Sequence, residues 1–394
     1  MEFRDLKQQY RVLREEMDRA MLDAIASGAY IMGPQVKELE KQLAEYVGVK
    51  RCLTCANGTD ALTLALKAWG IGPGDAVFVP DFTFFSSAEV VSLEGATPVF
   101  VDVCEDTFNI DAADLERAVH EVLAEGRLRP RVVVAVDLFG QPADYAAVRA
   151  VTDRYGLLVL EDGAQGFGGT IGTKRACSFG DISTTSFFPA KPLGCYGDGG
   201  AVFTDNEEWA ALIDSYRVHG KGQFKYDNVR IGLNSRLDTL QAAILQVKLK
   251  AFADYELDAV NLAAALYTEK LCHSERSEES IPATPVILPG FRSSWAQYTV
   301  RFADRAQRDA VQAALKAAGI PAMVYYPKPM HLQTAFAKTP DQVGGDGRNV
   351  IPGLTGNLPV ATSLCERVLS LPMHPYITEE EIDSVCGVIR QVVK

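Results

Sequence analysis

Lys191 stands in a segment that is otherwise apolar or rich in proline and glycine, SFFPAKPLG over residues 186–194. Most lysines keep their charge in solvent, but a lysine flanked by phenylalanine, proline and leucine is expected to lose part of its hydration. Loss of hydration disfavours the charged form, lowers the pKa of the amine and makes it a better nucleophile. The segment therefore predicts an amine that can form a Schiff base with a carbonyl carbon.

Two further polar segments each follow a predicted strand. Asp162 lies in EDGAQ, directly after the apolar run LLVL, where an acid serves as a metal ligand, a general base or a charge partner, or simply caps the next element. The turn NGTD at 57–60 precedes a predicted helix, whose free N–H groups suit a phosphate, although a plain N-cap turn has the same residues. Because ligands of an open parallel sheet bind at the carboxyl ends of its strands, we expect these segments to meet Lys191 there.

The three segments together match the requirements of pyridoxal 5'-phosphate (PLP). This cofactor needs a lysine for its aldehyde, a carboxylate that keeps its pyridine nitrogen protonated, and an anion site for its phosphate. Lys191, Asp162 and the 57–60 turn provide one of each. The combination predicts PLP more specifically than any of the three segments does alone. A dinucleotide is disfavoured, because the turn lacks the GxGxxG fingerprint.

The elements expected around these segments alternate between strands and helices. Several strands, such as VVVAV and LLVL, are apolar on both faces, which predicts a mostly parallel sheet sandwiched by helices. An amphipathic helix is expected over 5–27, and Pro34 opens another. Strands are expected over 51–56, 76–80, 97–103, 131–137, 157–162, 182–187 and 200–204, and helices over 59–69, 85–94, 111–124, 143–155 and 206–217.

The pattern changes after residue 236. A long helical stretch at 236–271 precedes SERSEES (274–280), which is expected to be an exposed loop insertion. A capping box, Thr378 with Glu381, predicts the last helix. Beyond the insertion the pattern predicts strands at 297–302 and 320–326, a helix at 308–319 and a loop at 340–360. We expect two domains: a large domain over residues 1–250 and a smaller C-terminal α/β domain over 251–394.

Composition and charge exclude several classes of protein. With 39 Lys and Arg against 51 Asp and Glu, the net charge of −12 argues against a nucleic-acid or anionic membrane partner. No apolar run approaches the ~20 residues of a membrane span, and the first 20 residues lack a secretory apolar core, so a cytoplasmic location is expected. The pair Cys52-x-x-Cys55 has no second pair beside it, which favours two ordinary strand thiols and no metal.

Ordered blocks along nearly the whole chain resemble the DegT/DnrJ/EryC1/StrS family of PLP-dependent nucleotide-sugar aminotransferases. The blocks are FRDLKQQY, GPQVKELE, ANGTDAL, EDGAQ, SFFPAKPLGCYGDGGA, GLNSRLDTLQAAIL, YYPKPMH and LSLPMHPY. The resemblance implies an α/β protein of PLP fold type I (aspartate aminotransferase-like), and a homodimer with shared active sites.

The resemblance also implies an activity, the transfer of an amino group from an amino acid, with glutamate as the expected donor, to a keto nucleotide sugar. Within the family the chain is most similar to enzymes that aminate UDP-2-acetamido-2-deoxy-3-oxo-D-glucuronate at C3. The alternatives are a dTDP-3-oxo-6-deoxyhexose or a 4-oxo sugar nucleotide as substrate, and, in another class, a non-catalytic PLP-bound sensor or regulatory protein. A related sugar dehydratase is disfavoured because it replaces the lysine with histidine.

Residue roles follow from the same resemblance. Lys191 is expected to form the Schiff base and move protons, and Asp162 to pair with the pyridinium. The other implied cofactor contacts are Gln165 at the ring hydroxyl, Thr59 and Ser186 at the phosphate, Gly58 and Asp60 through their backbone, Phe84 stacked on the ring, and Asn234 from the neighbouring subunit.

The implied substrate contacts are Arg236 from the neighbouring subunit, Tyr325, Tyr326, His219 and His331. Close relatives often have histidine where this chain has Tyr325. Tyrosine can donate a hydrogen bond but carries no positive charge near neutrality, so binding of a sugar carboxylate would be weaker here. The segments 272–282 and 337–360 also exceed the usual lengths of the family, and the second is expected to alter the sugar pocket.

Overall fold

The computed structural model describes residues 1–224, 226–272, 282–336 and 357–393. Its core is a seven-stranded sheet in the order β1-β9-β8-β5-β4-β2-β3. All neighbouring pairs are parallel except the two that involve β9, so the predicted mostly parallel sheet is confirmed. The strands are β1 (Arg51–Cys55), β2 (Asp75–Pro80), β3 (Thr97–Val101), β4 (Arg129–Val136), β5 (Leu158–Asp162), β8 (Ile182–Ser186) and β9 (Gly200–Thr204).

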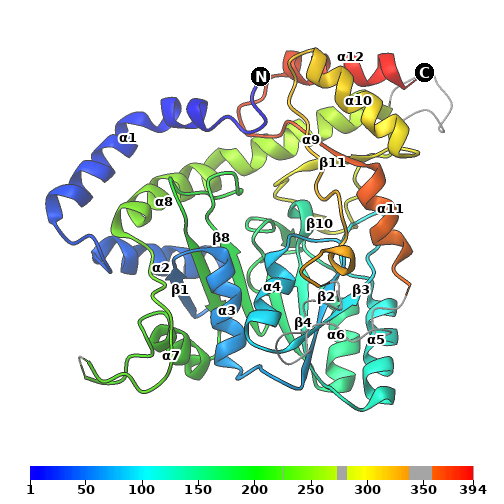
Figure 1. Cartoon of the computed structure of the whole chain (residues 1–394). Helices are drawn as coiled ribbons and strands as arrows, with labels where there is room; N and C mark the ends of the chain where they lie inside the picture. The colour runs from blue at the N-terminus through cyan, green and yellow to red at the C-terminus, as the bar shows by residue number, and fades with distance from the viewer. Residues whose placement is uncertain (225, 273–281, 337–356, 394) are drawn as a thin grey trace.

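Helices cover both faces of this sheet (Figure 1). Successive side chains of β4 point to opposite faces of the sheet, and each face has its own apolar cluster. Val132 and Val134 belong to the first cluster, and Val133 and Ala135 belong to the second. The first cluster includes α3 (Gly58–Ala68), α4 (Ser86–Leu93) and α7 (Glu207–Tyr216). The second includes α5 (Ala112–Glu125) and α6 (Tyr145–Tyr155). The sandwich expected from strands that are apolar on both sides is therefore present.

Four further helices run along one side of the sheet. They are α1 (Leu6–Ser27), α2 (Pro34–Val47), α8 (Thr239–Ala251) and α9 (Leu257–Cys272). Both α1 and α2 pack on α8. Asp5 caps the start of α1, and Gly28 ends it in the left-handed conformation, with φ at 66°. The long helix expected over 236–271 is interrupted by a π-helical turn, η2 (Phe252–Glu256), which places Glu256 inside the protein.

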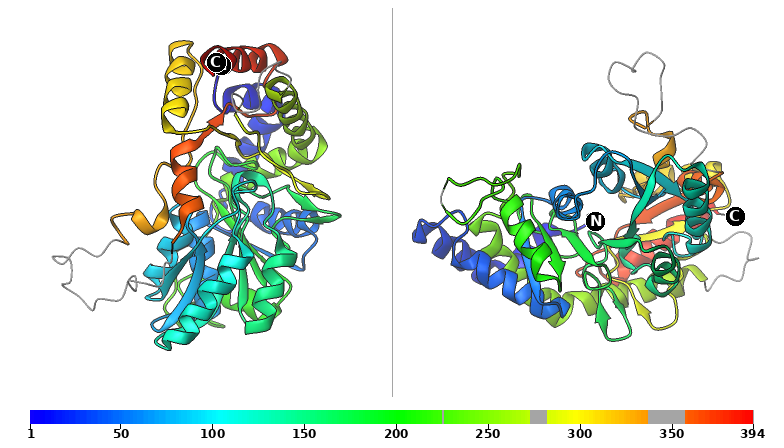
Figure 2. Two further views of the ribbon diagram at one scale, coloured as in Figure 1. Left: turned by 90° about the vertical axis from the view of Figure 1, so that its right-hand side faces the viewer. Right: turned by 90° about the horizontal axis from the view of Figure 1, so that it is seen from below.

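The C-terminal elements gather at the end of the sheet where α8 and α9 run (Figures 1 and 2). Strands β11 (Tyr298–Arg301) and β12 (Val368–Leu371) pair antiparallel beneath α10 (Arg305–Ala317) and α12 (Glu379–Val392). The predicted capping box of α12 is confirmed. A further helix, α11 (Pro359–Arg367), and a small sheet of β6 (Thr170–Ile171), β7 (Lys174–Arg175) and β10 (Phe291–Arg292) complete the described structure.

The strand predicted over 320–326 is wrong. The structure has only a single bridge there, between Met323 and Ser370. Pro321 lies within the segment and Pro327 directly follows it, and a proline cannot donate the N–H that a sheet ladder needs. The segment instead carries two tyrosines into the cavity described below.

Three sequence expectations are untested by this structure. The predicted insertions at 272–282 and 337–360 lie largely outside the described residues, which exclude 273–281 and 337–356. The domain boundary near residue 250 also stays a prediction, because one apolar cluster joins α2 and α8 with β11, β12 and α12.

Candidate active site

A cavity of about 480 Å³ opens at the carboxyl ends of β1, β5 and β8. Asp162 is the last residue of β5 and Ser186 the last of β8, so the strands themselves deliver these side chains. Residues from both ends of the chain complete the wall. They are Asn57, Gly58, Thr59, Leu62, Thr83, Phe84, Ser86, Val136, Asp162, Ala164, Gln165, Ser186, Phe188, Ala190, Lys191, Asp198, Gln297, Tyr325 and Tyr326.

The Asp162 carboxylate is buried, with 6% of the residue exposed. Its Oδ2 accepts a hydrogen bond from Ser87 Oγ at 2.8 Å, and its Oδ1 accepts one from the backbone N–H of Ala164 at 3.2 Å. Neither partner carries charge, and within the described residues no cation lies at ion-pair distance. Burial raises the pKa of Asp162, although the Ser87 bond and the charge of Lys191 oppose the shift. A buried acid of this kind is completed by a cation held in the cavity.

Lys191 lies in the loop after β8, where its backbone N–H donates to Phe188 O at 2.8 Å. The pKa of its amine is lowered, chiefly by burial and further by the charge of Arg4, while Asp162 opposes the shift. A larger share of the side chain is therefore the neutral, nucleophilic amine. The segment flanked by apolar residues thus places the lysine as its composition predicts.

The start of α3 forms a cradle of hydroxyl and N–H groups. Asn57 caps this helix by accepting the N–H of Asp60 at 2.8 Å. A Cβ on Gly58 would lie 2.7 Å from the Cβ of Ser186, so only glycine lets the helix approach the end of β8 so closely. Thr59 Oγ1 is 2.8 Å from Ser86 Oγ beside it. Donors at a helix N-terminus suit an anion such as a phosphate.

Aromatic and amide side chains form the opposite wall. Gln165 Oε1 accepts the backbone N–H of Phe139 at 2.8 Å, and its Nε2 donates to the Tyr326 hydroxyl at 3.1 Å. Phe84 faces the cavity with about half of its surface exposed. Tyr325 is half-buried, and burial raises the pKa of its hydroxyl, so the group is neutral near pH 7. The wall can hold a flat ring and offers hydrogen bonds without added charge.

Five predicted residues are not among those that line this cavity: Asp60, whose N–H already donates to Asn57, and Asn234, Arg236, His219 and His331. His219 and Arg236 line a separate hollow of about 960 Å³ on the segment after α7, and Arg236 donates to the neighbouring Asn234. Figure 1 shows this segment projecting from the body of the protein beside α7. His331 instead contacts the buried Asp81, with Nδ1 and Oδ2 2.6 Å apart. Within one chain the structure therefore brings together most of the predicted cofactor residues, but not Asn234, Arg236, His219 or His331.

The sequence reasoning missed several residues of the site. Ser86 and Ser87 follow DFTFF directly, at the start of α4, and the rule that strand ends carry ligands could have found them. Asp198 lies in the glycine-rich run after the lysine segment, where it has no distinctive signal. Gln297 reaches the wall from the C-terminal part of the chain, and no local pattern marks it.

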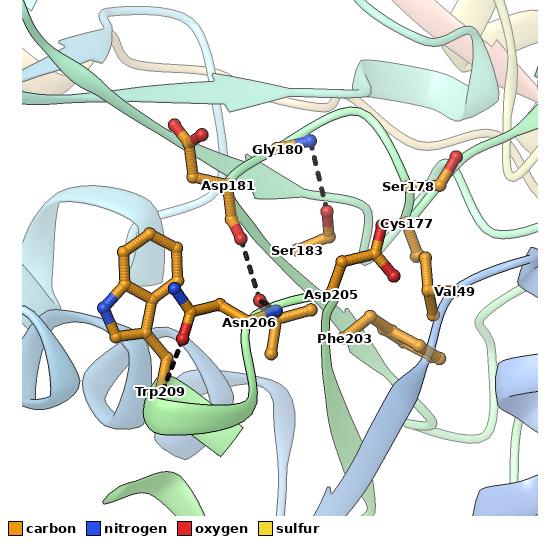
Figure 3. A pocket seen from close by; sticks show the side chains of 11 residues that line it. Val49, Cys177, Ser178, Gly180, Asp181, Ser183, Phe203, Asp205, Asn206 and Trp209 are labelled. Carbon is orange, nitrogen blue, oxygen red and sulfur yellow. Dashed lines mark hydrogen bonds between the residues drawn. The ribbon is translucent and has the colours of Figure 1, made fainter. Parts of the chain in front are cut away.

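A second cavity, of about 370 Å³, lies at the opposite end of β8 (Figure 3). Its polar groups already hold the fold together. Asp181 accepts from Arg149 Nη1 at 2.9 Å, Gly180 N donates to Ser183 Oγ at 3.3 Å, and Asn206 caps α7. Because these groups already bond to other groups of the protein, the cavity at the carboxyl ends of the strands is the better candidate site.

Two other expectations concern metals and membranes. Cys52 and Cys55 are free, buried thiols of β1, and the described ranges contain no cluster of three metal-ligating side chains. Across the same ranges, no helix combines the length and the apolar character of a membrane span.

Comparison with known proteins gives a consistent result. The model of the DegT/DnrJ/EryC1/StrS aminotransferase family matches residues 11–390. A Pseudomonas aeruginosa protein, UDP-2-acetamido-2-deoxy-3-oxo-D-glucuronate aminotransferase, is 42% identical and is covered over 99% of both chains. A Geobacillus stearothermophilus protein named pleiotropic regulatory protein is 40% identical, over 96% of this chain and 94% of its own. An Acidithiobacillus ferrooxidans UDP-N-acetyl-3-dehydro-alpha-D-glucosamine 3-aminotransferase is 39% identical, over 99% of this chain and 97% of its own.

Solved structures agree with these sequence matches. The crystal structure of a DegT DnrJ EryC1 StrS aminotransferase from Brucella abortus superimposes with a TM-score of 0.91 and 47% identity, over 99% of both chains. A Bacillus subtilis structure with the cofactor PMP bound superimposes with a TM-score of 0.83 and 27% identity, over 97% of this chain and 82% of the other. The predicted type I fold is confirmed by these neighbours.

Proposed function

We propose that this chain, which belongs to the DegT/DnrJ/EryC1/StrS aminotransferase family, transfers an amino group to the keto carbon of a nucleotide sugar. The substrate that we propose is UDP-2-acetamido-2-deoxy-3-oxo-D-glucuronate, aminated at C3, with glutamate as donor. The observation that carries the proposal is the cavity in which Lys191 and the buried Asp162, which has no ion-pair partner among the described residues, face the donor cradle of α3.

The residues of this cavity fit PLP. Among the described residues no cation lies at ion-pair distance from Asp162, although Lys191 attracts it from further away, and a protonated pyridine nitrogen would provide a close partner. The N–H groups of the first turn of α3 and the hydroxyls of Thr59 and Ser186 would hold the phosphate. Phe84 would cover the ring, and Gln165 would bond its hydroxyl. When bound, PLP supplies an electron sink for a carbon that has lost a proton.

The chain's own residues would then move the proton. The neutral amine of Lys191 can accept a proton at Nζ from the carbon that bears the donor's amino group, and can return a proton to the sugar carbon. Burial raises the pKa of Asp162, so a cation beside the carboxylate would stabilise its charged form, and the charged form would in turn hold a proton on the ring nitrogen. Asp162 acts from the end of β5, and Lys191 acts from the loop after β8, where its backbone N–H bonds to Phe188 O.

The choice of a uronate rests on the relatives and on Arg236. The P. aeruginosa relative is named for a 3-oxo-glucuronate and the A. ferrooxidans relative for a 3-dehydro sugar without that acid. Lys191 is the one cation among the residues that line the described cavity, and Tyr325 stays neutral. A sugar carboxylate would therefore need Arg236 of a second subunit, whose guanidinium can form two parallel hydrogen bonds with it.

A substrate panel tests this choice. Arg236→Ala should lower kcat/KM on the UDP-3-oxo-uronate by roughly 10–150-fold, the worth of a charged hydrogen-bonded pair, and should change turnover of the matching neutral sugar little. Arg230→Ala is the matched control, because Arg230 lines the same hollow but donates to Ser215. The panel includes dTDP-3-oxo-6-deoxyhexoses and 4-oxo sugars. Equal losses on acidic and neutral sugars would remove the case for a uronate, and no turnover of any sugar would favour a regulatory protein.

The segment after α7 supports a homodimer. Four apolar residues on it are more than half exposed, with Phe224 at 71% and Ile231 at 89%. Tyr30 and Ile31, between α1 and α2, are about half exposed, and they bond to the start of α8 through Thr239 and Asp238. Apolar surface of this extent on a folded chain is typical of a surface covered by a partner. In a symmetric dimer the segment could bring Asn234 and Arg236 to the partner's cavity.

Mixing the inactive Lys191→Ala variant with the impaired Arg236→Ala variant tests the shared site. If each site combines Lys191 of one chain with Arg236 of the other, a dimer of one Lys191→Ala chain and one Arg236→Ala chain has one site with both substitutions and one site with neither. After subunit exchange, activity on the uronate should rise to about a quarter of the wild-type value, because half of the dimers are mixed and each has one intact site. Exchange is verified by differential tagging. No recovery despite proven exchange would place both residues in the site of one chain.

A further inference from the structure

The first residues of the chain tie the lysine loop to the C-terminal part of the protein. Arg4 Nη2 donates to Pro192 O at 3.1 Å, one residue after Lys191. The carbonyl of Phe3 accepts the N–H of Met373 at 3.1 Å, and the ring of Phe3 lies edge-on to Tyr325, 6.1 Å between centroids. Figure 1 shows the N-terminus beside α12, far from the start of α2.

Arg4 lies in an unusual electrostatic environment. Within the described residues no carboxylate lies within ion-pair distance of its guanidinium, although Glu256 attracts it from further away. Burial lowers the pKa of Arg4 to about 10. Glu256 already accepts hydrogen bonds from Gln9 at 2.8 Å and from Tyr376 at 2.5 Å. The charge of Arg4 is therefore only partly offset.

A second buried cation lies behind the same loop. Lys248, on α8, is 1% exposed, and its Nζ lies 5.1 Å from the centroid of the Tyr196 ring. Burial and the charge of Arg4 lower the pKa of Lys248 to about 8. The two cations share Glu256 as the carboxylate that attracts them. The region behind the lysine loop therefore has an excess of positive charge.

We propose that Arg4 is a positioning residue for Lys191, which holds the lysine loop through the Pro192 carbonyl and opposes a positive charge on the lysine side chain. The proposal rests on the role assigned to Lys191 in the proposed function. Phe3, on the same segment, packs against Tyr325 of the cavity wall, whereas Arg4 itself bonds to the backbone beside Lys191, so its effect would pass through the lysine loop.

The direction of the effect follows from the charged groups that face each residue. Lys191 faces Asp162, which favours its ammonium form, and Arg4, which disfavours it. Arg4 in turn faces Glu256, Lys248 and the buried His374. Without the charge of Arg4, burial alone opposes the attraction of Asp162, so the pKa of Lys191 should rise. At a pH below that pKa, the neutral fraction of the amine should then fall.

Trace acetylation of the full-length protein measures this fraction. The protein carries pyridoxamine phosphate, a form in which the lysine amine is free, and the labelling rate of the peptide with Lys191 is followed against pH by mass spectrometry. In Arg4→Met, which keeps the aliphatic stem without the charge, labelling at neutral pH should slow roughly three- to tenfold. Arg4→Lys should remain nearer the wild type. Lys7→Met is the matched control, because Lys7 is an exposed cation of the same segment.

The outcomes separate this proposal from the proposed function. A labelling profile of Arg4→Met that coincides with that of Lys7→Met would overturn the role of Arg4, whatever the enzyme does with sugars. The same profiles recorded without cofactor report on Arg4 even if Lys191 proves not to hold PLP. Should Arg4→Met fail to fold, Arg4→Gln has the same expected shift, and no shift there would equally overturn the proposal.

Discussion

Lys191→Ala should abolish transamination, with a loss of at least about 10⁴-fold, while the protein stays folded and can retain PLP non-covalently. The variant lacks the amine of Lys191, which is the only lysine that lines the described cavity with Asp162. It therefore can neither bond to the aldehyde nor move the proton. Turnover of a keto nucleotide sugar, measured with glutamate and saturating PLP, gives the loss.

A matched control makes this result specific. Lys174→Ala removes an exposed lysine of β7, outside the residues that line the cavity, and should retain wild-type turnover. Circular dichroism and thermal unfolding compare the folds of both variants. Appreciable turnover by Lys191→Ala would mean that another residue performs the chemistry.

Asp162→Asn should slow the reaction by roughly 10²–10⁴-fold and weaken cofactor binding, because a neutral amide leaves the ring nitrogen without its charge partner. The amide can keep the shape of the side chain and the hydrogen bond from Ala164. The fold should therefore persist, and the loss should come from charge alone. Steady-state turnover at saturating PLP and a cofactor titration measure the two effects.

Ser87→Ala is the control for this variant, because it removes the hydroxyl that donates to Asp162 Oδ2 and leaves the carboxylate in place. A hydrogen bond to a charged group is worth about 1.5–3 kcal/mol, so the loss should be smaller than for Asp162→Asn. Near wild-type turnover of purified, PLP-saturated Asp162→Asn would contradict the role given to this acid.

The sequence predicts the sheet and the cofactor side of the site because both depend on local patterns. Strands apolar on both faces predict a buried parallel sheet, and β4 has that alternation in the structure. Asp162 and the turn before α3 follow strands directly, so the carboxyl-end rule places them together without knowledge of the fold. Residues close to a strand end were therefore predictable.

The remaining parts depend on contacts between distant segments. Arg4 bonds to Pro192 across a separation of 188 positions in the sequence, and Gln297 enters the cavity from beyond the described helices α8 and α9. The segment 320–326 has the apolar composition of a strand. Pro321 and Pro327 prevent a regular ladder, however, and its two tyrosines line the cavity. Asn234 and Arg236 lie away from the cavity of their own chain, so one subunit cannot reveal their role.

The identity of the lysine that bonds to the cofactor is the central claim, and one measurement tests it most directly. The purified enzyme is reduced with borohydride in the presence of PLP, digested, and mapped by mass spectrometry for the peptide that carries the reduced cofactor. The site geometry predicts the label on Lys191, because that amine has a lowered pKa and faces Asp162 in the cavity. A label on Lys174, Lys221 or any other lysine would contradict the assignment and the mechanism built on it.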